Sequence, residues 1–293
     1  MKSIYRFDKV GENLYNVTDT ADQGKLGVHM YFVIGEEKAL IFDTGFGIVD
    51  TLRQELEALT DKPIICVVGH GHPDHAGAAE LFDVVYMNHR DEGIIPNSLS
   101  YEKRMDDVFR EMGPGGPRVI DPVLKAYAEE HIVDPGGANF RYIDTNAGDV
   151  FDIGGDVFEV FELPWHTQGS IALLNREKNY CLVSDSISRM MGVTGTAFPQ
   201  EKGAGVRNFY EGIKALNDCI NDETQLWYGH SYDPLPVSYV RNITTAFEDI
   251  INGNTADDEP ARMPPPRPGM PPQPKKLAHK VGDITVSYDP LLV

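Results

Sequence analysis

The chain has 293 residues, of which 41% are hydrophobic and 10% aromatic, so it can bury a sizeable core in one large domain or two small ones. Its 45 acidic and 26 basic side chains give a formal net charge of −19, which repels phosphate backbones and anionic membranes and argues against both as main partners. The sequence has no run near the roughly 20 apolar residues that cross a bilayer and no apolar stretch of the signal-sequence type at its start, so we expect a cytoplasmic protein.

The first 90 residues predict short strands followed by alternating helices and strands. Residues 48–59 place apolar side chains at helical spacing, and residues 63–70 form an apolar run typical of a strand buried on both faces. Residues 75–82 resemble the start of a helix, with Asp74 placed to cap its first turn, and residues 84–88 predict another strand. Turn residues bound four earlier strand-like segments: 3–7, 13–18, 29–35 and 38–45.

Residues from about 90 to 137 differ from their surroundings, because they are charged, rich in methionine and broken by glycine and proline. We predict that they form a helical insertion beside the core. Beyond them the strand pattern returns, and two amphipathic helices alternate with further strands. The later elements are strand-rich residues 140–166, strands at 170–175 and 180–185, a helix at 205–220, a strand at 224–231 and a helix at 237–251.

Strand groups and helices thus occur twice in a similar order, which predicts two sheets packed face to face with helices outside them. We expect an α/β protein with a four-layer αββα sandwich, in which residues 1–293 form a single domain. A proline-rich segment at about 255–276 favours extended backbone and leads to a predicted hairpin at about 277–290. That segment suits a surface linker, a lid or a contact for a neighbouring subunit, and the sequence leaves these roles open.

The main chemical signal is the stretch VVGHGHPDHAGAAEL, where His70, His72, Asp74 and His75 lie within six positions. An extended chain puts the first two imidazoles on one side, and the glycine and proline of the motif let the chain turn so that the next two side chains face the same volume. A solvated, histidine-rich turn is the simpler explanation. A metal site is the stronger hypothesis, because these donors converge with no apolar neighbour between them.

A site for two metals needs more than four ligands, and three further strand ends supply candidates. His166 follows the apolar segment FELPW, Asp185 follows YCLVS, and His230 follows LWYG. Loops at strand ends are where proteins of this class build their sites. Three matching strand ends beside a four-residue cluster therefore favour one shared metal centre.

The ordered motifs HGHPDHAG, LPWHTQGSIALL, SD and YGHS resemble those of the metallo-β-lactamase fold superfamily, over roughly residues 10–252. The αββα architecture of that family agrees with the fold predicted above. The resemblance implies that Asp43, in the turn LIFDTG, orients the histidine loop without binding a metal. It implies seven ligands: His70, His72 and His166 for one metal, Asp74, His75 and His230 for the other, and Asp185 as a bridge between them.

The ligand set narrows the branch that the chain resembles. Class B β-lactamases typically use Cys, or His and Ser, where Asp185 stands, and flavodiiron relatives usually replace the second histidine, here His72, by an acidic residue. The chain is more similar to hydroxyacylglutathione hydrolases (glyoxalase II) and quorum-quenching lactonases. Gln168 departs from the HTPGS motif of those proteins, which bears on the shape of the loop and leaves the ligands unchanged.

The resemblance implies a dinuclear, metal-dependent hydrolase in which a hydroxide bridging two divalent ions attacks a small ester, thioester or lactone. Asp74 would be catalytic as well as a ligand, because its carboxylate would accept and donate the proton of the nucleophile. Zinc is the expected ion, since histidines favour borderline metals, and the carboxylates leave manganese or iron open. Ser188 and Arg189, just beyond Asp185, are candidate substrate contacts.

Two other functions fit the same motifs. A phosphodiesterase or nuclease would use the same scaffold, although the net charge of −19 argues against it. A non-catalytic metal-binding sensor would keep the site for ligand capture, although such a protein has no need to retain every ligand. We expect a small-molecule substrate and neither nucleic acid nor membrane as partner, and we leave open whether the chain forms a homo-oligomer.

Overall fold

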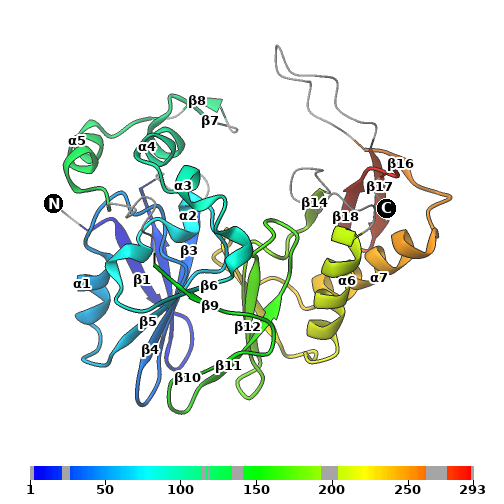
Figure 1. Cartoon of the computed structure of the whole chain (residues 1–293), viewed down its shortest axis with the longest axis horizontal. Coiled ribbons are helices and arrows are strands. Elements are labelled where there is room, and N and C mark those ends of the chain that lie inside the picture. The colour runs from blue at the N-terminus through cyan, green and yellow to red at the C-terminus, as the bar shows by residue number, and fades with distance from the viewer. Residues whose placement is uncertain are drawn as a thin grey trace.

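The structure is a computed structural model that describes residues 3–21, 27–113, 116–117, 119–133, 141–192, 204–261 and 276–291. Two sheets lie at the centre of the molecule, and helices cover the outer side of each (Figure 1). None of the helices in these ranges combines the length and apolar character that a membrane crossing requires.

The first sheet contains seven strands: β1 (Tyr5–Lys9), β2 (Leu14–Asp19), β3 (Val28–Ile34), β4 (Ala39–Phe42), β5 (Ile64–Val67), β6 (Val85–Met87) and β9 (Ile143–Asp144). They are neighbours in that order; β1 to β4 pair antiparallel, and β4, β5, β6 and β9 pair parallel. Parallel strands end at the same edge of a sheet. The loops after β4, β5 and β6 therefore emerge side by side.

The second sheet contains five strands: β10 (Val150–Asp152), β11 (Val157–Glu162), β12 (Ile171–Asn175), β13 (Tyr180–Ser184) and β15 (Gln225–Tyr228). Neighbours pair antiparallel except β13 and β15, which run parallel. Because two antiparallel steps separate β11 from β13, the strands β11, β13 and β15 all run in the same direction. Their carboxyl ends thus share one edge of this sheet.

Nine helical segments accompany the sheets: α1 (Leu52–Glu57), α2 (Pro73–Ala76), α3 (Ile95–Ser98), α4 (Tyr101–Phe109), α5 (Pro122–His131), α6 (Ala204–Asn217), α7 (Ser238–Asn252) and short 3-10 turns at Ala79–Leu81 and His89–Asp91, counted over the described residues. Helices α1 to α5 lie on the side of the first sheet, and α6 and α7 on the side of the second (Figure 1). The outer helices α6 and α7 pack through Phe209 and Phe247, which contact each other and Trp165.

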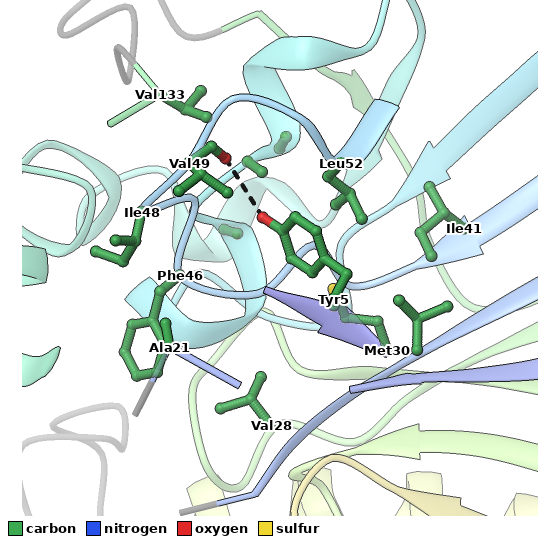
Figure 2. Packing of buried hydrophobic residues seen from close by; sticks show 14 of the residues in the cluster. Tyr5, Ala21, Val28, Met30, Ile41, Phe46, Ile48, Val49, Leu52 and Val133 are labelled. Atoms are coloured by element: carbon green, nitrogen blue, oxygen red, sulfur yellow. Dashed lines mark hydrogen bonds between the residues drawn. The ribbon is translucent and has the colours of Figure 1, made fainter. Parts of the chain in front are cut away.

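Strand β3 shows why the layers form. Its side chains alternate, so Met30 and Phe32 are buried in the core under the first set of helices, whereas Tyr31 and Val33 are buried between the two sheets. Figure 2 shows the outer core of the first sheet, where the Tyr5 hydroxyl donates a hydrogen bond to the Val49 carbonyl at 3.3 Å. Hydrophobic side chains thus fill three successive spaces between four layers, and the predicted αββα class is confirmed.

A smaller third sheet was not expected. It contains β14 (Met190–Gly192), β16 (Glu259–Pro260), β17 (Leu277–Val281) and β18 (Ile284–Tyr288), in the order β14-β18-β17-β16. The hairpin β17–β18 corresponds to the predicted C-terminal hairpin, and β14 pairs with it in parallel. A two-stranded ribbon of β7 (Met112–Gly113) and β8 (Gly116–Pro117) follows α4.

The prediction that Asp74 caps a helix over 75–82 is wrong: Pro73 starts a one-turn helix whose N-cap is His72, and a separate 3-10 turn follows. The segment predicted as a helical insertion contains α3, α4 and α5, and its last residues, 134–137, lie outside the described residues. Residues 262–275 of the proline-rich segment also lie outside them.

Candidate metal centre

All seven predicted ligands lie in loops at the carboxyl ends of strands. The histidine-rich loop follows β5 of the first sheet, whereas the loops after β11, β13 and β15 belong to the second. The two sheets bring these edges together, so that residues more than 150 positions apart in the sequence face one another, as His75 and His230 do. These predicted ligands are His70, His72, Asp74, His75, His166, Asp185 and His230.

Three imidazoles form the first group, which we call the three-histidine set (His70, His72 and His166). His72 Nδ1 lies 3.1 Å from His70 Nε2 and 2.9 Å from His166 Nε2. Two nitrogens that bind one tetrahedral zinc ion at about 2.0 Å are separated by about 3.3 Å. The three nitrogens therefore have the spacing of donors to one ion.

The second group, the aspartate set, consists of Asp74, His75 and His230. Asp74 Oδ2 lies 3.5 Å from both His75 Nε2 and His230 Nε2. Asp185 adjoins both groups, because its Oδ2 lies 3.0 Å from His230 Nε2 and 3.5 Å from His166 Nε2. The donors thus fall into two sets, and one carboxylate lies next to both.

Asp43 lies behind the aspartate set, next to His75. His75 Nδ1 donates to its Oδ2 at 2.8 Å, and the Gly69 backbone N–H donates to its Oδ1 at 2.7 Å. A histidine that donates through Nδ1 keeps the lone pair of Nε2 for a cation. Asp43 therefore has the contacts of a residue that orients the histidine loop.

Burial controls the charge of the three-histidine set. It lowers the pKa of His70 well below the ordinary value, an effect that the neighbouring imidazoles reinforce, and it lowers the pKa of His72 and, to about 4, that of His166. All three rings are neutral at pH 7, which is the form that binds a metal. His166 is also 36% exposed, so the site opens to solvent on this side.

The aspartate set has the opposite character. Burial alone would raise the pKa of Asp74, but the adjacent His75 outweighs it and lowers that pKa to about 2. Burial would likewise lower the pKa of His75, but the carboxylates of Asp185, Asp74 and Asp43 raise it well above the ordinary value. In the metal-free chain a proton on His75 therefore offsets the negative charge of Asp74 and Asp185, whose pKa values are lowered.

Two buried polar atoms at the centre make no hydrogen bond within the described part of the chain: His75 Nε2 and Asp185 Oδ1. Unsatisfied buried polar atoms cost free energy and are rare in folded proteins. Both atoms belong to predicted ligands, and Nε2 of His75 faces the carboxylates of Asp74 and Asp185. The histidine and carboxylate donors present and these two unsatisfied atoms fit divalent cations.

The sequence patterns did not single out two residues that contact the ligand loops. Ser184, the last residue of β13, places its hydroxyl 3.1 Å from His70 Nδ1 and donates to Asp43 Oδ2 at 2.7 Å. Asp91, just beyond β6, accepts hydrogen bonds from the loops of His70 and His166. Ser184 ends its strand, so the rule that identified Asp185 and His230 could have found it, whereas Asp91 lies in a 3-10 turn four residues beyond β6 and no such rule indicates it.

The candidate substrate contacts are held by local structure. The Ser188 hydroxyl donates to the Met190 carbonyl at 2.9 Å, and the Arg189 carbonyl accepts from the Thr285 N–H at 3.1 Å. The Arg189 side chain is exposed. This segment is therefore anchored to the C-terminal hairpin, and a substrate contact by either side chain stays a prediction.

Comparison with protein families identifies one match: the model of the metallo-beta-lactamase superfamily covers residues 24–197. Among curated proteins, human "Acyl-coenzyme A thioesterase MBLAC2" is 23% identical over 198 residues, covering 62% of this chain and 66% of that protein, just under two thirds of its length. "Hydroxyacylglutathione hydrolase GloC" of Haemophilus influenzae is 25% identical over 196 residues, covering 67% of this chain and 81% of that protein.

Solved structures show the same fold at low identity. A "Metallo-beta-lactamase from Pontibacter korlensis" superposes with a TM-score of 0.53 and 14% identity, covering 84% of this chain and 99% of that one. A beta-lactamase domain protein from Burkholderia ambifaria gives a TM-score of 0.55 and 15% identity, covering 86% and 78%. At such identities the likeness is one of fold.

Proposed function

The chain belongs to the metallo-β-lactamase superfamily, and from this premise we propose that it is a dinuclear, metal-dependent hydrolase of small thioesters, with esters and lactones as the nearest other substrates. The observation that carries the proposal is the contact of Asp185 Oδ2 with both the aspartate set, through His230, and the three-histidine set, through His166. A carboxylate in that position can hold two cations side by side.

Thioesters come first among the substrates because both relatives described above carry the name of a thioester hydrolase. That likeness is distant. It supports a thioester as the bond that is cleaved, and it does not identify the acyl and thiol groups of the substrate. The net charge of −19 favours a small molecule over a nucleic acid.

Divalent ions held by the two sets would lower the pKa of water towards neutrality and polarise an acyl carbonyl. Zinc suits a site with five histidines, and manganese or iron are the alternatives that two carboxylates permit. The chain itself supplies the acid–base group. Asp74, ionised because its pKa is about 2, would accept a proton from attacking water and return it to the leaving thiolate. The exposed edge of His166 gives the substrate its approach.

The test is a metal analysis followed by a substrate screen on one preparation purified without chelators. We expect two divalent ions per chain and the highest kcat/KM on thioesters, in a panel that also contains lactones, β-lactams and bis-p-nitrophenyl phosphate. Faster cleavage of the phosphodiester would replace the proposal by a phosphodiesterase. Two bound ions without turnover of any acyl substrate would favour a sensor, and a chain without bound metal would overturn the proposal altogether.

A further inference from the structure

A second buried carboxylate, that of Asp91, lies outside the seven ligands and beside the three-histidine set. The residue ends the 3-10 turn after β6 and is 1% exposed. Its Oδ2 accepts hydrogen bonds from the Gly71 N–H at 2.7 Å and from the Thr167 hydroxyl at 2.6 Å, and its Oδ1 accepts one from the Gly169 N–H at 2.7 Å. Three donors to one buried carboxylate are a strong and directional arrangement.

The positions of these donors in the sequence carry the inference. Gly71 lies between His70 and His72, and Thr167 directly follows His166. One carboxylate therefore joins the loop after β5 to the loop after β11, and these two loops supply every member of the three-histidine set. The distances between the three imidazoles depend on how these loops are held relative to each other.

The two glycines allow the carboxylate to come this close. A Cβ atom at position 169 would lie 2.6 Å from Asp91 Cγ, and one at position 71 would lie 3.1 Å from Asp91 Cβ. Any larger residue at position 169 would displace the carboxylate or the loop. The contact therefore depends on both the Asp91 carboxylate and the absence of a side chain at Gly71 and Gly169.

We propose that Asp91 is a positioning residue that sets the metal affinity of the three-histidine set and leaves that of the aspartate set unchanged. The inference rests on the proposed function, because it takes the two sets to be metal sites. On the other side Asp43 accepts hydrogen bonds from His75 Nδ1 and the Gly69 N–H, so a different buried carboxylate contacts a ligand of the aspartate set directly. Removing the Asp91 carboxylate should therefore lower the affinity for the ion of the three-histidine set.

The test variant is Asp91→Asn, which keeps the shape of the side chain. Its amide group has one acceptor oxygen, and its NH2 group would face a backbone N–H instead of accepting from it. We expect one of two zinc or cobalt(II) ions to bind about 10–100-fold more weakly, the usual effect of losing a supporting contact to metal ligands, and the other to bind as in the wild type.

Imidazole nitrogen NMR identifies which ion is affected. His72 presents Nδ1 to its neighbours, whereas His70, His166, His75 and His230 present Nε2. In Asp91→Asn the Nδ1 signal of His72 should therefore titrate with the weakly bound ion. A signal that titrates with the tightly bound ion would contradict the assignment of Asp91 to this set.

Asp156→Asn is the matched control. Asp156 is also buried and accepts hydrogen bonds from Asn175 and Lys178, but it precedes β11 and so lies at the opposite end of that strand from His166. We expect it to bind both ions with wild-type affinity. Equal weakening by both variants would show that loss of any buried carboxylate affects the centre, and it would overturn the role of Asp91.

A second variant and a metal-free measurement separate this inference from the proposed function. Gly169→Ala keeps Asp91 but forces its carboxylate away from the loop after β11. This variant should also weaken binding of the ion in the three-histidine set. In the metal-free chain, amide exchange at Gly71 and Gly169 should become at least tenfold faster in Asp91→Asn; unchanged exchange would show that the contact does not hold the loops. A wild-type chain that binds no metal would overturn the proposed function and the affinity claim together, whereas two ions bound equally tightly by wild type and Asp91→Asn would overturn the inference alone.

Discussion

The Ser184 hydroxyl lies 3.1 Å from His70 Nδ1, on the side of the ring opposite to the nitrogen that faces His72. The same hydroxyl donates to Asp43 Oδ2 and lies 3.2 Å from His75 Nδ1. Because its own proton goes to the carboxylate, it can accept the Nδ1 proton of His70 and leave the Nε2 lone pair free. One side chain therefore orients a ring of the three-histidine set and touches a ring of the aspartate set.

Replacing Ser184 by Ala or by Gly should weaken metal binding about tenfold, since both changes remove the hydroxyl behind His70. The two variants should differ in stability. Ser184 has φ of 45°, in the left-handed region, which costs residues with a Cβ about 1–2 kcal/mol. We expect the metal-free Gly variant to be more stable to urea than the Ala variant by up to about 1 kcal/mol, because greater chain entropy in the unfolded state offsets part of the gain. A more stable Ala variant would contradict this explanation.

Asp43→Asn should affect the ion of the aspartate set. Asn tolerates the left-handed backbone at this position, where φ is 66°, so the loop should keep its course. Its amide cannot accept from both Gly69 and His75, and the contact to His75 Nδ1 is lost. Isothermal titration should show about 10–100-fold weaker binding of one ion. The double variant Asp43→Asn/Asp91→Asn should bind both ions more weakly than the wild type. A double variant that still binds one ion tightly would show that the two carboxylates support the same set.

Asp185→Asn should be more severe than either of these changes, because it alters a predicted ligand shared by both sets. We expect metal affinity and kcat/KM on thioesters to fall by more than the about 10–100-fold that loss of a supporting contact costs. The matched control is Asp152→Asn, an exposed residue on β10, which should behave as wild type. Wild-type turnover by a metal-replete Asp185→Asn variant would refute the bridging role.

Most of the site could be predicted because its residues follow a simple rule. Polar side chains such as Asp185 and His230 come directly after apolar strands, and strands that run in the same direction place their carboxyl ends at one edge. The two sheets also follow from alternating and continuous apolar runs, as in β3 and β5. Local pattern and global architecture agree here, so the order of strands and helices was sufficient.

The remaining features depend on contacts that no local pattern records. Asp91 falls in the charged segment that the sequence predicts as a helical insertion, although its carboxylate is buried by donors from two distant loops. The pairing of β14 with β18 joins segments nearly 100 residues apart, which periodicity cannot reveal. The prediction that Asp74 caps a helix is wrong: Asp is common at helix starts, whereas here its carboxylate faces His75 and His230.

Arg104 of helix α4 is a buried cation that we expect to stabilise the fold. Its guanidinium is fully buried, and it donates to the carbonyls of Leu99, Gly77 and Val133, so it joins α4 to the loop after α2. Arg104→Met would leave several buried acceptors unsatisfied, at about 1–3 kcal/mol each. We expect the free energy of unfolding to fall by about 3 kcal/mol or more in urea titrations.

Arg241→Met is the control for this loss, because Arg241 makes a surface ion pair with Asp222 and should change stability by less than about 1 kcal/mol. Arg104→Lys should recover only part of the stability, since a compact ammonium cannot reach carbonyls that a planar guanidinium spans. Gly77 directly follows the helix that carries Asp74 and His75, so the Met variant should also bind the ion of the aspartate set more weakly. An Arg104→Met variant as stable as the Arg241→Met control would show that water or rearranged neighbours satisfy these carbonyls, and that α4 does not support the histidine loop.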